Sequence, residues 1–249
     1  MVGGNSKRGT VASMLELELL AGATLESAPY QWAYVPNAIP HRPAAELLAT
    51  FPDVDFWHVQ AHDGEKYFDY LNRPLVLLGH DRPWRAETLA PVWQSVAEQV
   101  LSRSYRSALE SLLGRSLDDA VVEASVWRWH PNAQIGPHVD HVSKVLTQVV
   151  YFNVGWRAEW GGCLRVLGSS DPLDSMSELP PALGSSSVVV RSDRSWHCVT
   201  PVLSSAPMER LSLIVTWLLE GSSSPAWDVE PDGSVVAKCG IAPVAVVRG

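Results

Sequence analysis

The feature that most constrains the fold is a series of short strand-like segments in the second half of the chain. From Ala120 onward, runs rich in Val, Leu and Trp alternate with the turn residues Gly, Pro, Ser and Asp. Strands at such close spacing, with no long helical pattern between them, indicate an all-β barrel or sandwich. The expected strands are residues 121–129, 146–153, 162–167, 186–191, 199–203 and 211–218.

The first half of the chain is expected to support this β core with helices. Residues 31–39 have strand character, and residues 40–50 predict a helix because proline is tolerated in a first turn. Residues 90–113 carry one apolar stripe at helical spacing, which predicts a single helix that ends at Gly114. Residues 56–78 are aromatic-rich and are expected to be irregular.

We expect one large domain with an extension at each end. The chain has 249 residues, of which 46% are hydrophobic, and this is enough to bury a substantial core. Residues 1–28 are expected to form an N-terminal arm that could be unanchored. Residues 29–220 form the domain, with helical support over 40–114 and the β core over 120–219. Residues 221–249 form a C-terminal extension, either a hairpin or a loose tail.

Composition excludes several classes of function. The net charge is −8 and Lys and Arg form no block, so a nucleic acid partner is not expected. No run of 18 apolar residues exists, so no membrane span is expected, and the N-terminal apolar run contains glutamates that a signal peptide would lack. The cysteines Cys163, Cys198 and Cys239 are odd in number and lack metal-binding spacing, which suits free thiols in a reducing cytoplasm.

One motif suggests metal chemistry. In His138-Val139-Asp140, side chains two positions apart in an extended segment point the same way, so His138 and Asp140 can grip one ion. His197 lies far along the chain and would have to come from another strand. Two imidazoles and one carboxylate on one face of a metal leave the other face open, as in non-haem Fe(II) oxygenases.

The segment after this motif resembles a known family. It contains Tyr151, Asn153, Trp156, the pair Gly161-Gly162 and then Leu-Arg-Val-Leu, which is similar to the stretch "Y-L-N-x-x-W-x-x-x-x-G-G-x-L-R-L". That stretch is typical of the prolyl-4-hydroxylase-like branch of the Fe(II)/2-oxoglutarate-dependent dioxygenases. The resemblance covers residues 126–218, under half the chain. It implies a double-stranded β-helix (a cupin-like jelly roll) with flanking helices, Fe(II) bound in its mouth, and 2-oxoglutarate and O2 as cosubstrates.

The resemblance also suggests which residues hold 2-oxoglutarate. A buried carboxylate needs a fixed cation, and Arg210 begins an otherwise apolar strand and shares a face with Ser212. Arg210 could instead be a strand-end surface charge. Tyr151 matches a tyrosine that bonds the same carboxylate in some relatives, or is a core aromatic. His130 stands where relatives often have tyrosine, so it could bind cosubstrate or substrate, or lie at the barrel rim.

The expected activity is hydroxylation of an unactivated C–H bond, with release of succinate and CO2. A small-molecule substrate, such as an amino acid or a specialised metabolite, is favoured because no peptide-recognition domain is evident. The alternatives are a prolyl hydroxylase acting on a protein or peptide, and a non-catalytic β-barrel that binds a metal or ligand. Arg210 argues against the last, because a buried cation without its anion would be costly.

A substrate region is also predicted. Loops on a rigid scaffold carry specificity, and a reactive centre must exclude water and stray molecules. Residues 56–73 are therefore expected to form a loop over the barrel opening that recognises a polar or anionic substrate; the alternative is a surface excursion that packs on the long helix. The residues expected to contact substrate are Arg128, Trp129, Lys66, Tyr67 and Arg73.

Overall fold

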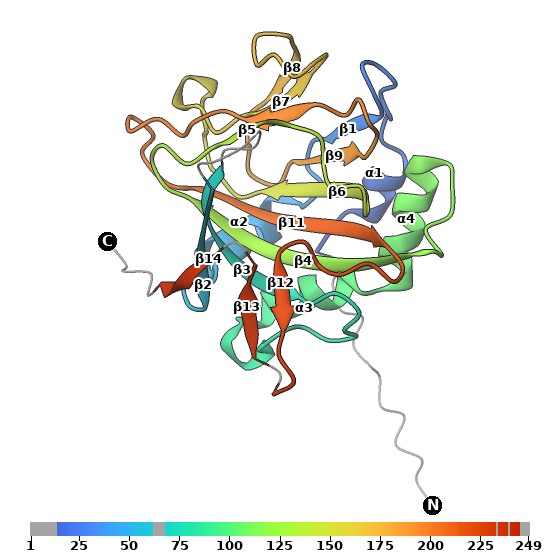
Figure 1. Ribbon diagram of the computed structural model, residues 1–249, viewed down its shortest axis with the longest axis vertical. Coiled ribbons are helices and arrows are strands. Elements are labelled where there is room, and N and C mark those ends of the chain that lie inside the picture. The colour runs from blue at the N-terminus through green and yellow to red at the C-terminus, as the bar shows by residue number, and fades with distance from the viewer. Residues whose placement is uncertain (1–13, 62–67, 233, 239, 245–249) are drawn as a thin grey trace, which may run out of the picture.

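Most strands of the chain join one curved antiparallel sheet. The computed structural model describes residues 14–61, 68–232, 234–238 and 240–244, and Figure 1 shows the sheet curling around an interior with the helices against one side. In sheet order the strands are β1 (Trp32–Val35), β9 (Ser186–Val190), β6 (Lys144–Tyr151), β11 (Arg210–Leu219), β4 (Ala120–Trp129), β3 (Phe68–Val76), β5 (Ile135–His138), β10 (His197–Val199), β7 (Leu164–Leu167) and β8 (Ser175–Leu179). Strand β2 (Phe56–Ala61) pairs with β3 and with β14 (Gly240–Val244).

The central strands are buried on both faces, which explains their nearly continuous apolar sequence. β11 lies between β6 and β4 in antiparallel register. Because side chains alternate along a strand, Leu213 and Val215 face one way and Ile214 faces the other. Leu213 and Val215 belong to the large core shared with the helices, whereas Ile214 lines the interior of the curved sheet. The sheet therefore separates a helix-packed core from an interior that can hold a ligand.

The predicted long helix is wrong in one respect, because it is two helices. They are α3 (Pro91–Val100) and α4 (Arg103–Leu113), and both lie with α1 (Leu17–Ala21) and α2 (His41–Ala49) against the outer side of the sheet. Ser102 interrupts the run, because its side chain accepts a hydrogen bond from the Tyr105 backbone N–H at 3.2 Å and caps α4. The predicted stop at Gly114 is confirmed by its left-handed backbone, with φ of 64°. Short 3₁₀ turns occur at Ala86–Thr88 and Ala158–Trp160.

Both extensions pack against the body of the protein, and the C-terminal one is a hairpin, one of the two forms expected. Leu15 and Leu20 are almost fully buried in the helix-packed core, so the described part of the N-terminal segment is anchored. At the other end, β12 (Trp227–Val229) pairs with β13 (Val235–Ala237) as a hairpin. The Trp227 ring packs edge-on against Trp57 of β2, with ring centroids 5.3 Å apart. The C-terminal hairpin is therefore part of the packed body.

Several strand assignments need correction. Residues 56–78 are not irregular, because they contain the paired strands β2 and β3. β10 is displaced from the predicted 199–203 toward the N-terminus, so that it begins at the metal-ligand candidate His197. β5 and β8 were not predicted, since β5 contains glycine and proline and β8 is largely exposed. Within the described residues, no helix is long and apolar enough to cross a bilayer.

Candidate active site

The fold brings the predicted metal ligands together from separate segments. His138 ends β5, Asp140 follows two residues later, and His197 begins β10; the two histidines lie opposite each other across the strand pair. Their ring centroids are 4.2 Å apart. The candidate ligand atoms of all three residues lie within 4.8 Å of one another, and all three residues are buried.

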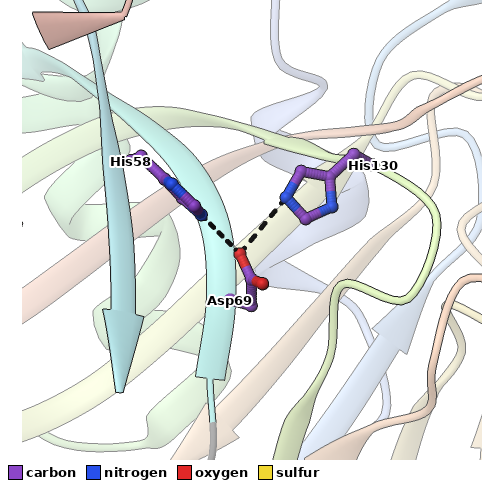
Figure 2. Close-up of side chains that lie close together, drawn as sticks. All are labelled: His58, Asp69 and His130. Carbon is purple, nitrogen blue, oxygen red and sulfur yellow. Dashed lines mark hydrogen bonds and ion pairs between the residues drawn. The ribbon is translucent and has the colours of Figure 1, made fainter. Parts of the chain in front are cut away.

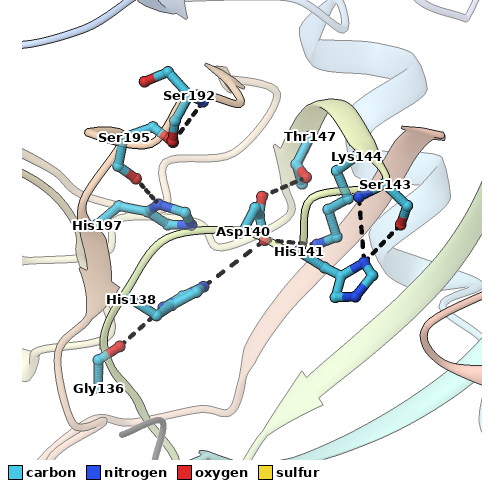
Figure 3. A network of polar contacts seen from close by, with 10 residues as sticks. All are labelled: Gly136, His138, Asp140, His141, Ser143, Lys144, Thr147, Ser192, Ser195 and His197. Atoms are coloured by element: carbon cyan, nitrogen blue, oxygen red, sulfur yellow. Dashed lines mark hydrogen bonds and ion pairs between the residues drawn. The ribbon is translucent and has the colours of Figure 1, made fainter. Parts of the chain in front are cut away.

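Backbone carbonyls orient both imidazoles. His138 Nδ1 lies 2.9 Å from the carbonyl oxygen of Gly136, and His197 Nδ1 lies 2.8 Å from that of Ser195 (Figure 3). A carbonyl can only accept, so each Nδ1 carries the proton and donates it. The lone pair is then on Nε2 of each ring, which is the atom that can bind a metal.

Asp140 is held through both of its carboxylate oxygens. Oδ2 accepts a hydrogen bond from the Thr147 hydroxyl at 3.0 Å, and Oδ1 accepts one from Lys144 Nζ at 2.7 Å (Figure 3). Oδ1 is also the oxygen that lies 3.9 Å from His138 Nε2. A metal ion on Oδ1 would take over the charge compensation that Lys144 now supplies, while Thr147 keeps the carboxylate in place.

This donor set fits Fe(II). Two neutral imidazoles and one carboxylate are ligands that a first-row divalent ion accepts, and the 3.9 Å separation leaves room for an ion between them. A facial arrangement of three protein ligands also leaves further coordination positions for a cosubstrate.

A second histidine–aspartate cluster lies elsewhere and has a different geometry. Asp69 Oδ1 is 2.7 Å from His58 Nε2 and 3.2 Å from His130 Nε2 (Figure 2). The ligand atoms of this cluster also lie within 4.8 Å of one another. These contacts have hydrogen-bond lengths, so Asp69 is hydrogen-bonded directly to the two histidines and no space is left between them for a metal ion. It ties β2 and β3 to the segment that follows β4.

A cavity of about 280 Å3 connects the metal ligands with Arg210. Arg210 is 1% exposed, and burial lowers the pKa of its guanidinium. Nε donates to the carbonyl oxygen of Gly162 at 2.6 Å and Nη1 donates to Ser212 Oγ at 3.3 Å. Among the described residues, no carboxylate pairs with Arg210. A buried cation of this kind is costly without an anion, so the cavity is suited to an anionic ligand.

Aromatic rings enclose the Arg210 guanidinium. Its central carbon lies 4.6 Å from the Trp129 ring centroid and 5.2 Å from that of Tyr151. Burial raises the pKa of Tyr151, so its hydroxyl stays protonated, and this hydroxyl lies 2.7 Å from Ser187 Oγ. The structure thus brings together three of the four predicted cosubstrate residues: Arg210 and Tyr151 line the cavity, and Ser212 lies behind them, hydrogen-bonded to Arg210.

Steric constraints explain why glycine occupies both position 161 and position 162. Both glycines have positive φ, and a Cβ on Gly161 would lie 1.9 Å from the carbonyl oxygen of Pro201. A Cβ on Gly162 would approach Arg210 Cδ to 3.0 Å. The two glycines therefore allow the backbone to come close enough for the Gly162 carbonyl to hold Arg210.

Other predicted site residues lie away from this cavity. His130 belongs to the second cluster, and Arg128 donates through Nε and Nη2 to one oxygen, Oε2, of Glu209. Arg73 is fully buried beside Asp55 and Thr88, because it packs on the outer side of β3. Of the predicted substrate residues only Trp129 lines the cavity; Lys66 and Tyr67 lie outside the described residues. The predicted loop over 56–73 contributes strand residues instead, namely Val59, Phe68, Tyr70 and Asn72.

We expect Arg73 to contribute to stability and not to ligand binding. Its Nη2 donates to Thr88 Oγ1 at 2.7 Å, and burial lowers its pKa to about 10. Arg73→Ala should destabilise the fold by roughly 3 kcal/mol or more, because it removes a buried charge and leaves a void. Urea unfolding of this variant, with the exposed Arg82→Ala as control, measures the loss. A large change in 2-oxoglutarate affinity in the folded variant would contradict this assignment.

Several cavity residues were not predicted from the sequence. Glu123 and Asn72 are buried acceptors that line the cavity, and Glu123 Oε2 and Asn72 Oδ1 have no hydrogen-bond partner among the described residues. Thr147 and Lys144 hold Asp140. The sequence offered one sign of the Glu123 site: a charged residue within the otherwise largely apolar predicted strand 121–129.

The buried carboxyl of Glu123 predicts a pH-dependent stability. Burial raises its pKa, although a Ser224 hydrogen bond, Lys144 and Lys238 act in the opposite direction. The folded state then binds the Glu123 proton more tightly than the unfolded state, so stability is lost as pH rises through the raised pKa. Glu123→Gln lacks this loss and should be more stable than the parent by roughly 1–3 kcal/mol at pH 8.

Unfolding in urea at several pH values measures this difference. The advantage of Glu123→Gln should shrink toward pH 4.5, where the parent carboxyl is protonated. Glu220→Gln is the matched control, since Glu220 is exposed. A pH-independent difference between the Glu123→Gln variant and its parent would show that Glu123 does not titrate in this way.

Comparisons with known proteins agree with this geometry. Residues 124–218 match the family model described as the 2OG-Fe(II) oxygenase superfamily. A prolyl-4-hydroxylase from Pseudomonas putida is 20% identical, with a TM-score of 0.57 over 81% of this chain and all of that one. A 2OG-Fe(II) oxygenase family oxidoreductase from Burkholderia pseudomallei is 18% identical, with a TM-score of 0.56 over 77% and 87% of the two chains. No curated protein sequence matches this chain.

A third similar structure is a prolyl hydroxylase from Trichoplax adhaerens in complex with a hypoxia inducible factor peptide fragment. It is 14% identical, with a TM-score of 0.52 over 83% of this chain and 88% of that one. Similarity at these identities shows the fold, and it confirms the expected double-stranded β-helix. The matched family model describes oxygenases that use Fe(II) and 2-oxoglutarate, and it covers under half of this chain.

Proposed function

We propose that this protein is an Fe(II)- and 2-oxoglutarate-dependent hydroxylase of a small molecule, such as an amino acid or a specialised metabolite. Arg210 carries the proposal: it is a buried guanidinium, with no carboxylate partner among the described residues, in the cavity that contains the three metal-ligand candidates. A dicarboxylate that reaches from Arg210 to a metal would satisfy both features.

Each residue would have a defined role. His138, Asp140 and His197 would hold the iron, and the backbone carbonyls of Gly136 and Ser195 would keep the histidine lone pairs directed at it. Bound iron would supply the oxidising chemistry that converts 2-oxoglutarate and O2 to succinate and CO2 and hydroxylates a C–H bond.

The remaining groups would bind and position the cosubstrate. Arg210 and Ser212 would bind its distal carboxylate, and the protonated Tyr151 hydroxyl would donate to the same group. Trp129 and Leu164 would exclude water from this end of the cavity. Excluding water strengthens the charge–charge contact and protects the reactive centre.

The small-molecule assignment rests on the cavity. Its volume is about 280 Å3 and its walls include the stacked rings of Tyr70 and Trp127, 3.9 Å apart at their centroids. Pockets of this kind are typical of small ligands. Hydroxylation of a prolyl residue in a peptide is the second candidate, because two of the similar structures are prolyl hydroxylases. We place the protein in the cytoplasm, which suits the two buried free thiols Cys163 and Cys198.

Oxygen-dependent formation of succinate from 2-oxoglutarate tests the activity. The purified chain with added Fe(II) should release succinate at a low uncoupled rate, and the rate should rise when a fraction of cell extract supplies the substrate. Filtering the extract by size separates the two candidates, since a peptide or protein substrate would stay with the large fraction. No succinate above the metal-free control under any condition would refute the proposed activity.

A further inference from the structure

The cavity has two ends with opposite chemistry. Every second side chain of β11 points to the same face, and on this face lie Arg210, Ser212, Ile214 and Thr216. Arg210 and Thr216 are six positions apart, so they are separated by on the order of 20 Å along the strand. Arg210 makes one end cationic. At the other end Thr216 pairs across strands with Glu123 of β4, and both residues line the cavity.

The buried carboxyl of Glu123 has fewer hydrogen bonds than its two oxygens can accept. The residue is 7% exposed, and its Oε2 has no hydrogen-bond partner among the described residues. Burial raises its pKa despite the Ser224 hydrogen bond and the two lysines Lys144 and Lys238. Lys144 is already bonded to Asp140 at 2.7 Å. A buried carboxyl without a donor is costly, so this oxygen is suited to a donor that arrives with a ligand.

The position of Glu123 relative to the metal ligands suits a substrate. Thr147 of β6, Thr216 of β11 and Glu123 of β4 are consecutive partners across three neighbouring strands. Two strand spacings put Glu123 roughly 10 Å from Thr147, which holds the metal-ligand candidate Asp140. A small molecule anchored at Glu123 can therefore extend to the metal, while the cosubstrate approaches from the Arg210 end.

The C-terminal extension covers this end of the cavity. Pro225 and Ala226 line it, and the Ser224 hydroxyl acts to lower the pKa of the nearby Glu123 carboxyl. Ser224 is fixed in turn, because its Oγ accepts from the backbone N–H groups of Ala226 and Trp227 at 3.1 Å each. Glu123 and the 224–226 segment both lie outside the residues 124–218 that match the family model. This end is thus built largely from parts of the chain that the family match does not cover.

We propose that Glu123 and Thr216 form a binding site for an ammonium group of the substrate. The inference rests on the proposed function and specifies its substrate class. An ammonium group has three donors and no acceptor, and here it would meet Oε2 of Glu123 and the hydroxyl of Thr216, two residues that are direct partners across the strand pair. The contact is charge-assisted and partly dry, which makes it selective for a cation over a neutral group of equal size.

Three six-carbon probes with different head groups test the proposal: hexylammonium, 1-hexanol and hexanoate. Calorimetry uses the full chain loaded with Zn2+, which blocks turnover, and with 2-oxoglutarate at pH 8. Hexylammonium should bind at least tenfold more tightly than 1-hexanol, as one charge-assisted bond predicts, and hexanoate more weakly than either. Glu123→Gln should bring hexylammonium and 1-hexanol within about twofold of each other.

Matched variants keep the test decisive. Glu220→Gln makes the same charge change at an exposed position and should keep the full preference. If Glu123→Gln does not fold, Thr216→Val is isosteric and should reduce the preference by itself. A preference that survives either cavity substitution in a folded protein, or no preference in the parent, overturns the proposal. Hexylammonium binding that appears only in Lys144→Met also overturns it, because Lys144 would then be the natural partner of Glu123.

The outcome is separable from that of the proposed function. 2-Oxoglutarate binding depends on the Arg210 end and the metal ligands, whereas the head-group preference depends on the Glu123 end, so the two measurements test different proposals. If the parent binds 2-oxoglutarate but binds hexylammonium no more tightly than 1-hexanol, only the ammonium site is refuted. Absence of 2-oxoglutarate binding and of succinate formation in the parent would refute the proposed function itself.

Discussion

His138→Ala and His197→Ala should each abolish tight iron binding and reduce succinate formation by about a thousandfold or more. The Nε2 lone pairs of both rings face the same site, because each Nδ1 donates to a backbone carbonyl at 2.9 or 2.8 Å. Loss of one imidazole removes a ligand from a three-ligand centre. Metal-based stabilisation of charge is worth several kcal/mol, and each ~1.36 kcal/mol is a factor of ten in rate.

Metal analysis after gel filtration and a succinate assay measure both effects. His80→Ala is the control, because His80 is an exposed histidine outside both histidine–aspartate clusters. His58→Ala tests the second cluster and should keep full iron content, since its contacts to Asp69 have hydrogen-bond length. Full-affinity iron in the folded His138→Ala or His197→Ala protein would disprove the assignment of the ligands.

Much of the β core could be predicted because periodicity is a local property of the sequence. β4, β6, β9 and β11 lie within about two residues of the expected strands, and each contains apolar residues between clear turn boundaries. β5 was missed because Gly136 and Pro137 disfavour a strand in isolation, and pairing with β10 overrides that local preference.

In the helical half, a single residue, Ser102, divides a helix that the apolar periodicity predicted to be continuous. The apolar stripe of residues 90–113 continues across Ser102, so the sequence suggested one helix. The structure begins a second helix there, because the Ser102 hydroxyl replaces a backbone acceptor for Tyr105. The β2–β3 pair was missed for another reason: its strands carry Trp57, His58 and Arg73 among polar residues and show no clean alternation.

For the site, residue type predicted which side chains the fold would bring together better than it predicted their surroundings. The His-x-Asp motif, the distant histidine and the strand-end arginine are recognisable by type, and the fold brings them to one cavity. The predicted substrate arginines failed because Arg128 and Arg73 have carboxylate neighbours within the protein, Glu209 and Asp55. Ion-pair partners distant in sequence cannot be read from a local pattern. For the same reason, nothing in the sequence indicated that Glu123 Oε2 would be buried without a hydrogen-bond partner among the described residues.

Arg210→Ala should weaken 2-oxoglutarate binding by tens- to thousands-fold while iron affinity changes little. Removing one partner of a buried, charge-assisted pair costs roughly 2–5 kcal/mol, and each ~1.4 kcal/mol is tenfold in affinity. Arg210 is 1% exposed and is positioned by the Gly162 carbonyl at 2.6 Å, so its fork is already ordered before any ligand arrives. Because the Arg210 side chain is preorganised, ligand binding does not have to order it, and replacing it therefore costs more affinity.

Two further variants separate charge from geometry at this position. Arg210→Lys keeps the charge but loses the planar fork, so its 2-oxoglutarate affinity should fall between those of the parent and Arg210→Ala. Ser212→Ala removes only the hydroxyl that accepts from Nη1 at 3.3 Å, and a loss of about tenfold or less is expected. Calorimetry with Zn2+-loaded protein measures all three without turnover. Equal 2-oxoglutarate affinity in the parent and Arg210→Ala, with metal content preserved, would mean that the cosubstrate carboxylate is held elsewhere. The buried cation would then need another anion, because its hydrogen bonds to Gly162 and Ser212 and its aromatic neighbours supply no negative charge.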